Sequence, residues 1–186
     1  MLFGNALPMA VFASISLCAQ EQALKPLQAS PGATVTQELG ISSLRIDYHR
    51  PAVKTRTIWG DLVPYGKVWR AGANEATLFT FSDPVKIAGR ELPAGSYAFF
   101  AIPEKASWTL IFNRQGKQWG AYNYKPEQDA LRFEAKPRAV SQQEYLRFDV
   151  DVKTPERLHV ELSWEKLAVG FDVDIDVKGI YWKHLE

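Results

Sequence analysis

The chain has 186 residues, and its 22 Lys and Arg against 21 Asp and Glu give a formal net charge of +1. No basic patch or acidic tail stands out, so we expect no nucleic acid partner. With 46% hydrophobic and 23% charged residues, the composition is typical of one globular domain that can bury a core of its own.

The first 20 residues, MLFGNALPMAVFASISLCAQ, carry no charged side chain. Their apolar part is too short to span a bilayer and ends in small residues, which is typical of a secretory signal peptide. We therefore expect a signal peptide over residues 1–19, a linker over 20–32 and a single domain over 33–186. The protein would then be secreted or periplasmic.

Two alternatives for this N-terminal segment stay open, a buried helix and a lipid anchor at Cys18. Leu17 is a poor residue before a lipid-modified cysteine, so the sequence favours the signal peptide. Cys18 is the only cysteine, and cleavage after Ala19 would leave a chain without thiol or disulfide chemistry.

From Ala33 onward, apolar and polar residues alternate with a period of two, which predicts strands. The pattern is cleanest over residues 145–152, 157–164 and 169–177. One apolar and one polar face per strand is typical of antiparallel sheets packed face to face. We expect an all-β antiparallel β-sandwich, jelly-roll-like or immunoglobulin-like, of roughly nine to eleven strands. Short helical turns are expected only at residues 126–131 and 141–146.

Residues 50–76, RPAVKTRTIWGDLVPYGKVWRAGANEA, interrupt the alternation with two prolines and three glycines. A connection of this length in a compact domain is usually either functional or disordered. The segment is too rich in apolar and aromatic residues to remain disordered. The sequence therefore predicts one long ordered loop, where a binding site would be expected.

The aromatic and polar residues of this loop are candidate ligand-binding groups. Aromatic rings can form a stacking surface for sugars and other flat ligands, while Arg, Asn and Glu supply directional hydrogen bonds. Residues 113–124 contain a second aromatic patch. The candidate set is Arg50, Arg56, Trp59, Tyr65, Trp69, Arg70, Asn74, Glu75, Trp119 and Tyr122. In the structural alternative, the aromatics cover one end of the sandwich and Arg70 pairs with Glu75 to hold the loop.

Signals for a cofactor, a metal or a known catalytic motif are weak. The chain has no Gly-x-Ser-x-Gly, phosphate-binding loop or dinucleotide fingerprint, so we expect no cofactor. Its three histidines, His49, His159 and His184, have no metal-ligand spacing, and we expect no metal site. The acidic run Asp172, Asp174 and Asp176 could attract calcium, but a solvated sheet face explains it better. Glu75 with His49 and Arg70 could still act as an acid–base group, so enzymatic activity stays open.

The segment RPAVKTRTIWGDLVPYGKVWRAGANEAT, followed by LPAGSYAFFAIP, WTLIFN and WGAYNY, resembles the bacterial family called domain of unknown function 2911. The family block R-P-x-V-K-x-R-x-I-x-G-x-L-V-P-Y-G-x-V-W-R-x-G-A-N-E-A-T is matched at Arg50, Pro51, Val53, Lys54, Arg56, Ile58, Gly60, 62–66, 68–70 and 72–77. Thr55 stands where glycine is common. The resemblance covers roughly Ala33 to the C-terminus. It implies a secreted protein and brings no established activity.

Three hypotheses follow for function. We favour a non-enzymatic binding module for a small polar or carbohydrate-like ligand. The alternatives are a hydrolase that uses Glu75 with His49 and Arg70, and a structural or protein-interaction module in which Arg70 and Glu75 form an internal brace. The sequence leaves open the strand order, the oligomeric state, and whether the loops 50–76 and 113–124 share one cleft.

Overall fold

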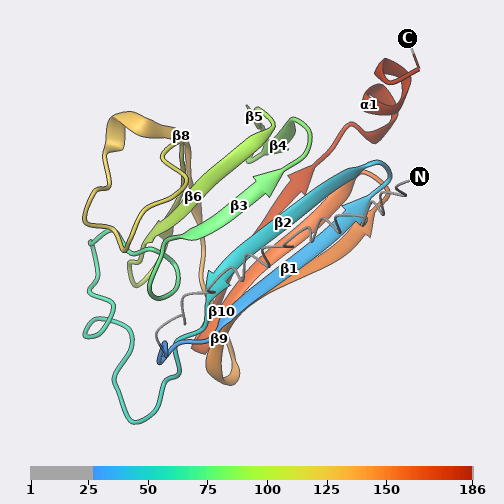
Figure 1. The fold of residues 1–186 in the computed structure, drawn as a ribbon. Helices are drawn as coiled ribbons and strands as arrows, with labels where there is room; N and C mark the ends of the chain where they lie inside the picture. Colours follow the sequence, from blue (N-terminus) through green and yellow to red (C-terminus); the bar gives the residue numbers. More distant parts are fainter. Residues whose placement is uncertain (1–26, 186) are drawn as a thin grey trace, which may run out of the picture.

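The computed structural model describes residues 27–185. The expected signal peptide, Cys18 and most of the expected linker lie outside these residues. The described chain forms two antiparallel sheets packed as a β-sandwich, which confirms the predicted fold class (Figure 1). Within residues 27–185, no helix has both the length and the apolar character needed to cross a membrane.

The larger sheet has six strands in the order β1-β2-β3-β6-β7-β8. They are β1 (Gly32–Leu39), β2 (Ser42–His49), β3 (Thr77–Phe81), β6 (Gly95–Ile102), β7 (Trp108–Asn113) and β8 (Asp129–Ala135). The smaller sheet has four strands in the order β5-β4-β10-β9. They are β5 (Arg90–Leu92), β4 (Val85–Ile87), β10 (Arg157–Asp174) and β9 (Arg138–Thr154). In Figure 1, β9 and β10 lie behind β1 and β2.

Strand β10 joins two segments that the alternation pattern indicates as separate strands. Its buried residues are even-numbered at Leu158, Val160 and Leu162 but odd-numbered at Phe171 and Val173. Because side chains alternate strictly along a strand, such a switch requires an extra residue. That irregularity lies near position 165, where the pairing with β9 shifts register and Glu165 has φ 55°.

The two short helices expected from the sequence are corrected by the structure. Residues 141–146 belong to β9, where Gln143 pairs with Glu165 of β10 and Tyr145 pairs with Ala52 of the long loop. Only Pro126–Gln128 forms a 3-10 turn before β8 begins. An unpredicted helix, α1 (Val177–Lys183), follows β10. Asp176 caps it by accepting a hydrogen bond from the Gly179 backbone N–H at 2.9 Å.

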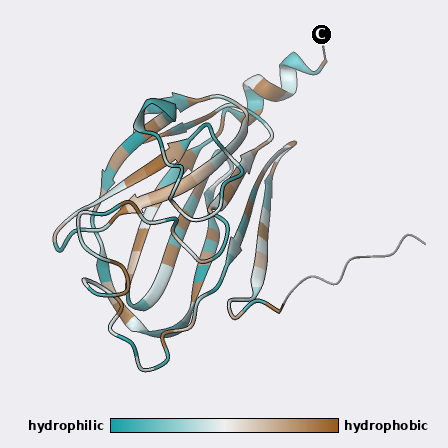
Figure 2. Ribbon diagram, turned by 60° about the vertical axis from the view of Figure 1, so that its left-hand side comes forward, coloured by the Kyte–Doolittle hydropathy of each residue, from teal (hydrophilic) through white to brown (hydrophobic). Residues whose placement is uncertain are grey.

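Aromatic rings form two groups within one continuous core between the sheets. Phenylalanines from both sheets fill the middle, for example Phe79, Phe99, Phe112, Phe148 and Phe171. Toward the long loop, a tryptophan cluster of Trp59, Trp69, Trp108 and Trp164 takes over, with ring centroids as close as 4.8 Å. Figure 2 shows the matching alternation of hydrophobic and hydrophilic residues along the strands.

Candidate functional site

The loop 50–76 is anchored to β9 by its own backbone at its start. The Val53 N–H donates to the Glu144 carbonyl at 2.8 Å, and Pro51 accepts from the Leu146 N–H at 3.0 Å. Two candidate arginines stabilise this junction. Arg50 donates to the Leu146 carbonyl at 2.9 Å, and Arg56 donates to the carbonyls of Ala52 and Val53. Arg50 therefore ties the loop to β9, and Arg56 holds the loop's own backbone.

The aromatic candidates of the same loop pack mainly inward. Trp59 and Trp69 belong to the tryptophan cluster, where Trp69 lies stacked on Trp164 with centroids 5.9 Å apart. The Trp69 indole N–H also donates to the Gly72 carbonyl at 3.2 Å. The Tyr65 ring lies against Gly60, so closely that a Cβ on this glycine would lie 2.9 Å from the ring. The expected open stacking platform of these three residues is thus largely a packed end of the sandwich.

The loops 50–76 and 113–124 contact each other directly. The Ala76 N–H donates to the Gln118 carbonyl at 2.9 Å, and the Gly120 N–H donates to the Asn74 carbonyl at 3.0 Å. Glu75 and Trp119 form an isolated antiparallel bridge between them. Asn74 makes this junction with φ 56°, a left-handed conformation that Asn tolerates better than most residues. The two candidate segments therefore form one paired unit.

This paired unit covers part of the outer face of the six-stranded sheet. A small second core lies beneath it, made of Ala76, Ala98, Phe100 and Ile111. At Gly116 the covering loop approaches β3 so closely that a Cβ would lie 3.2 Å from the Leu78 Cδ1. The loop thus has a fixed position over the sheet.

A pocket of about 510 Å³ opens beside this cover, between it and the outer face of β1 and β2. Both sheet and loops contribute to its walls. The lining residues are Gly32, Ala33, Thr34, Asp47, Tyr48, His49, Glu75, Ala76, Leu78, Gly116, Lys117 and Gln118. The pocket combines a mostly apolar lining with a few polar groups, which is the usual character of a small-molecule site.

His49 and Glu75 form the central polar pair of this pocket. The His49 Nδ1 lies 3.4 Å from the Glu75 Oε2, and their side chains are 20% and 51% exposed. Glu75 therefore pairs with His49 rather than with Arg70, the partner expected in the structural alternative. The carboxylate remains accessible enough to meet a ligand.

Asp47 and Gln118 add two further polar groups. Hydrogen bonds from Arg45 lower the pKa of Asp47 below its usual value, and Thr34 donates to the same carboxylate at 2.6 Å. Gln118 is only 7% exposed, and its Nε2 donates to the Gln115 carbonyl at 2.7 Å. Its Oε1 accepts no hydrogen bond from the described residues. A buried acceptor without a donor is costly, so a donor that reached Gln118 would relieve this cost.

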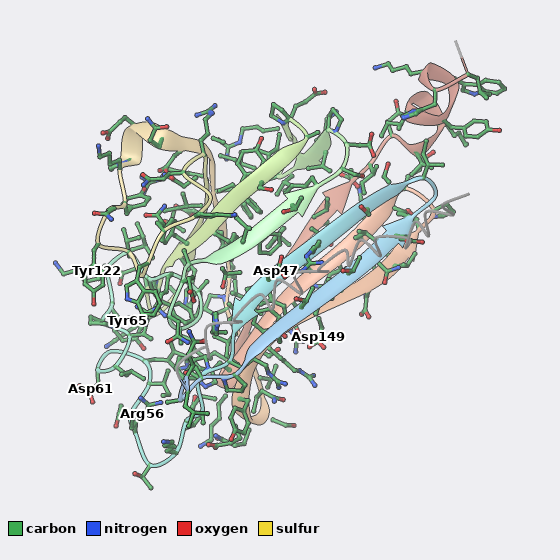
Figure 3. The ribbon with its side chains drawn as sticks, viewed as in Figure 1. Asp47, Arg56, Asp61, Tyr65, Tyr122 and Asp149 are labelled. Carbon is green, nitrogen blue, oxygen red and sulfur yellow. The ribbon has the colours of Figure 1, made fainter. Side chains whose placement is uncertain are left out.

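Arg70, Trp119 and Tyr122 lie outside the pocket lining. Trp119 is 54% exposed and Tyr122 is 83% exposed. In Figure 3, Tyr122 and Tyr65 lie at the loop end of the molecule, whereas Asp47 lies over the strands. The candidate residues named from the sequence therefore divide among loop anchors, core packing, the pocket and a separate exposed region.

Sequence reasoning missed Asp47, Thr34 and Gln118 as pocket residues. A signal for Asp47 was present, because Asp47 and His49 are two apart in a strand and so point to the same face. Gln118 had no such signal, because its position depends on how the loop 113–124 folds back over the sheet.

Within residues 27–185, no group of three or more His, Cys, Asp or Glu side chains is arranged to hold a metal ion. The acidic run that follows Phe171 is paired instead. Asp172 contacts His159 at 2.7 Å, Asp174 pairs with Arg157, and Asp176 caps α1.

Comparison with known proteins relates the chain to a protein family. No curated protein and no solved structure matches it. The model of the family described as "Protein of unknown function (DUF2911)" matches residues 30–173, from just before β1 to near the end of β10. This match spans most of the chain and includes both sheets and both loops of the site. The chain therefore belongs to the DUF2911 family.

Proposed function

We propose that this protein is a binding module that takes a small polar, carbohydrate-like ligand in the pocket beside His49 and Glu75. The observation that carries the proposal is the combination, in one pocket, of an accessible carboxylate and a buried acceptor without a donor among the described residues. Both groups accept hydrogen bonds, so they favour a ligand rich in hydroxyl or amide donors.

The apolar part of the lining supports the same ligand class. Ala33, Ala76 and Leu78 line the pocket together with the polar groups. A sugar ring also combines polar and apolar surface, with hydroxyl groups around its edge and C–H groups on its faces. The C–H face would contact the apolar lining while the hydroxyls meet Glu75 and Gln118.

The test is a thermal-shift screen of the purified protein with neutral mono- and disaccharides and with N-acetylated sugars. A ligand that binds the folded state raises the melting temperature in proportion to its concentration relative to Kd. Glu75→Gln and Gln118→Leu should each weaken the binding of a hit by about tenfold or more, since each leaves a ligand group unpaired. Asp172→Asn, on the opposite sheet, is the matched control and should bind normally. No shift with any sugar would contradict the proposal.

Hydrolysis is a second candidate, favoured by the distance of 3.4 Å between His49 and Glu75 in an open pocket. An acid–base pair in contact and accessible to solvent is the arrangement that general-base activation of water requires. Arg70, the third residue expected to assist, does not line the pocket. The discriminating measurement is turnover of nitrophenyl esters and glycosides. Activity that survives Glu75→Gln would exclude this mechanism.

We also propose that the protein works outside the cytoplasm, in the periplasm or secreted. The uncharged, apolar N-terminal segment supports this location. Cell fractionation of the native chain, together with mass spectrometry of its mature N-terminus, would test it. A mature chain that begins at Gln20 fits signal cleavage, a lipid-modified Cys18 would instead indicate an anchor, and an intact Met1 in the cytoplasm would contradict the proposal.

A further inference from the structure

Arg70 is a half-buried cation that has no anionic partner among the described residues. Its Nε is sealed from solvent and makes no hydrogen bond within residues 27–185. Burial lowers the pKa of Arg70, and the side chain forms none of the ion pairs found in the described structure. A guanidinium group stays charged at neutral pH, so burial without a partner is unfavourable unless another group supplies the missing acceptors.

The space beside this guanidinium group is bounded by Gly120 and Tyr122. A Cβ placed on Gly120 would lie 3.7 Å from the Arg70 Nη1 and 2.8 Å from the Tyr122 ring. Gly120 also has φ 63°, which disfavours a larger residue. The Tyr122 ring therefore packs directly on Gly120, and the Arg70 guanidinium group lies next to the same glycine.

Aromatic surface extends outward from this point. Tyr122 is 83% exposed, and Trp119, which precedes Gly120, is 54% exposed. Trp119 and Tyr122 are three residues apart, and neighbouring exposed aromatic side chains can mark a binding surface. Aromatic faces next to a cation suit ligands that combine a ring with an acidic group.

We propose that Arg70 and Tyr122, with Trp119 beside them, form a second ligand site that takes an oxyanion, a carboxylate or a phosphate, carried on a sugar-like ring. Arg70 binds the oxyanion through its two terminal amino groups, and the ring lies against Tyr122. The backbone of Arg70 is held where its carbonyl accepts from the Thr77 N–H at 3.3 Å. Gly120, which has no Cβ, lets the Tyr122 ring lie close to the guanidinium group.

This site is independent of the pocket proposed above. Neither Arg70 nor Tyr122 lines that pocket, and Tyr122 lies at the loop end while Asp47 lies over the strands (Figure 3). The two sites share only the backbone junction between residues 74–76 and 118–120. A variant of one site can therefore be used as a control for the other.

The test is isothermal titration calorimetry of the purified protein with glucuronate, glucose 6-phosphate and glucose. We expect at least one acid to bind about tenfold or more tightly than glucose, because only the acids can pair with the guanidinium group. A preference between the two acids identifies the oxyanion. Arg70→Gln should remove the advantage of the acid over glucose. Arg70→Lys should restore only part of it, because an ammonium group lacks the planar fork.

Two further variants keep the test decisive if Arg70→Gln fails to fold. Tyr122→Ala removes the stacking ring and Gly120→Ala displaces it, both without touching the charge, and both should weaken binding of the preferred acid. Glu75→Gln should bind that acid normally even if the pocket proposal is correct. Equal affinity for glucose and both acids would overturn the proposal. So would unchanged binding in Tyr122→Ala and Gly120→Ala, or loss of acid binding in Glu75→Gln alone.

Discussion

The outer faces of the two sheets each carry a histidine–carboxylate pair, but the two pairs have different surroundings. On the six-stranded sheet, His49 and Glu75 lie 3.4 Å apart beside a loop that covers part of the face. On the four-stranded sheet, His159 and Asp172 lie 2.7 Å apart on a face that the described loops leave uncovered. The hollow there measures about 200 Å³ against about 510 Å³ for the pocket.

The uncovered face is built from charges that satisfy one another. Arg138 makes a two-pronged contact with Glu161, and Arg147 and Lys153 pair with the aspartates two residues away on β9. One of these, Asp149, labelled in Figure 3, belongs to β9 of the four-stranded sheet, whereas Asp47 belongs to β2 of the six-stranded sheet. A histidine next to a carboxylate is thus an ordinary feature of a solvated sheet. The apolar cover and the unpaired acceptor of Gln118 are what distinguish the pocket.

The largest difference in stability between the two faces is expected from the loops that cover the six-stranded sheet. Phe100 is fully buried under the loops and lies edge-on to Tyr124 at 5.2 Å. Phe100→Ala should lower the free energy of unfolding by about 3–5 kcal/mol, since it leaves a cavity in the second core. Arg138→Gln on the uncovered face should change it by about 1 kcal/mol or less, because exposed ion pairs contribute little. Urea unfolding measures both, and equal effects would show that the cover packs loosely.

The next largest effect tests the uncovered face. A Cβ on Gly170 would lie 2.6 Å from the His159 Nε2 and 3.0 Å from the Val160 carbonyl. Gly170→Ala should therefore push His159 away from Asp172 and cost about 1–3 kcal/mol of unfolding free energy. In a His159→Ala background the same change should cost clearly less. A cost that persists there would assign the strain to the backbone instead.

The two histidine pairs themselves should contribute little to stability. Double-mutant cycles on His49 with Glu75 and on His159 with Asp172 should each give a coupling below about 1 kcal/mol, with the shorter pair the stronger. Chemical unfolding of the single and double variants provides the values. A His49–Glu75 coupling well above that of the other pair would mean that it braces the loop, which would weaken the binding proposal.

The smallest effect is expected in the pH dependence of stability, through Asp47 in the pocket wall. Because hydrogen bonds from Arg45 lower the pKa of Asp47, its folded-state pKa lies below the unfolded one. Its contribution to stability is therefore complete above the unfolded pKa, about 3.9, and is lost as the pH falls below it. Asp47→Asn should flatten the acid limb of a plot of unfolding free energy against pH. Arg45→Met should flatten it similarly, and a steeper limb in either variant would contradict the assignment.

The alternation of apolar and polar residues predicted the sandwich because a strand in a two-layer fold must turn every second side chain inward. It also contained the irregularity in β10, as the change from even to odd buried positions between Leu162 and Phe171. Strand propensity at residues 141–146 was weak, so helix was expected there. Pairing with β10 at Gln143 and with the start of the loop 50–76 made it strand instead.

The candidate site was predicted as a region but not as a set of contacts. Loop length, aromatic content and the match to the family block marked residues 50–76 correctly as ordered. Trp59 and Trp69 could equally have faced a ligand or the core, because a tryptophan side chain suits both. The packing of Trp108 and Trp164 from the two sheets turned them inward.

By itself, the sequence determined the all-β class, the ordered loop and the family, since these depend on periodicity and on local composition. Only the tertiary structure decided that Glu75 meets His49 and that Arg70 lies apart from the pocket. It also decided that the two loops pair over one sheet face. Contacts between residues far apart in the chain depend on strand order and on how loops fold back, and no local pattern encodes either of these.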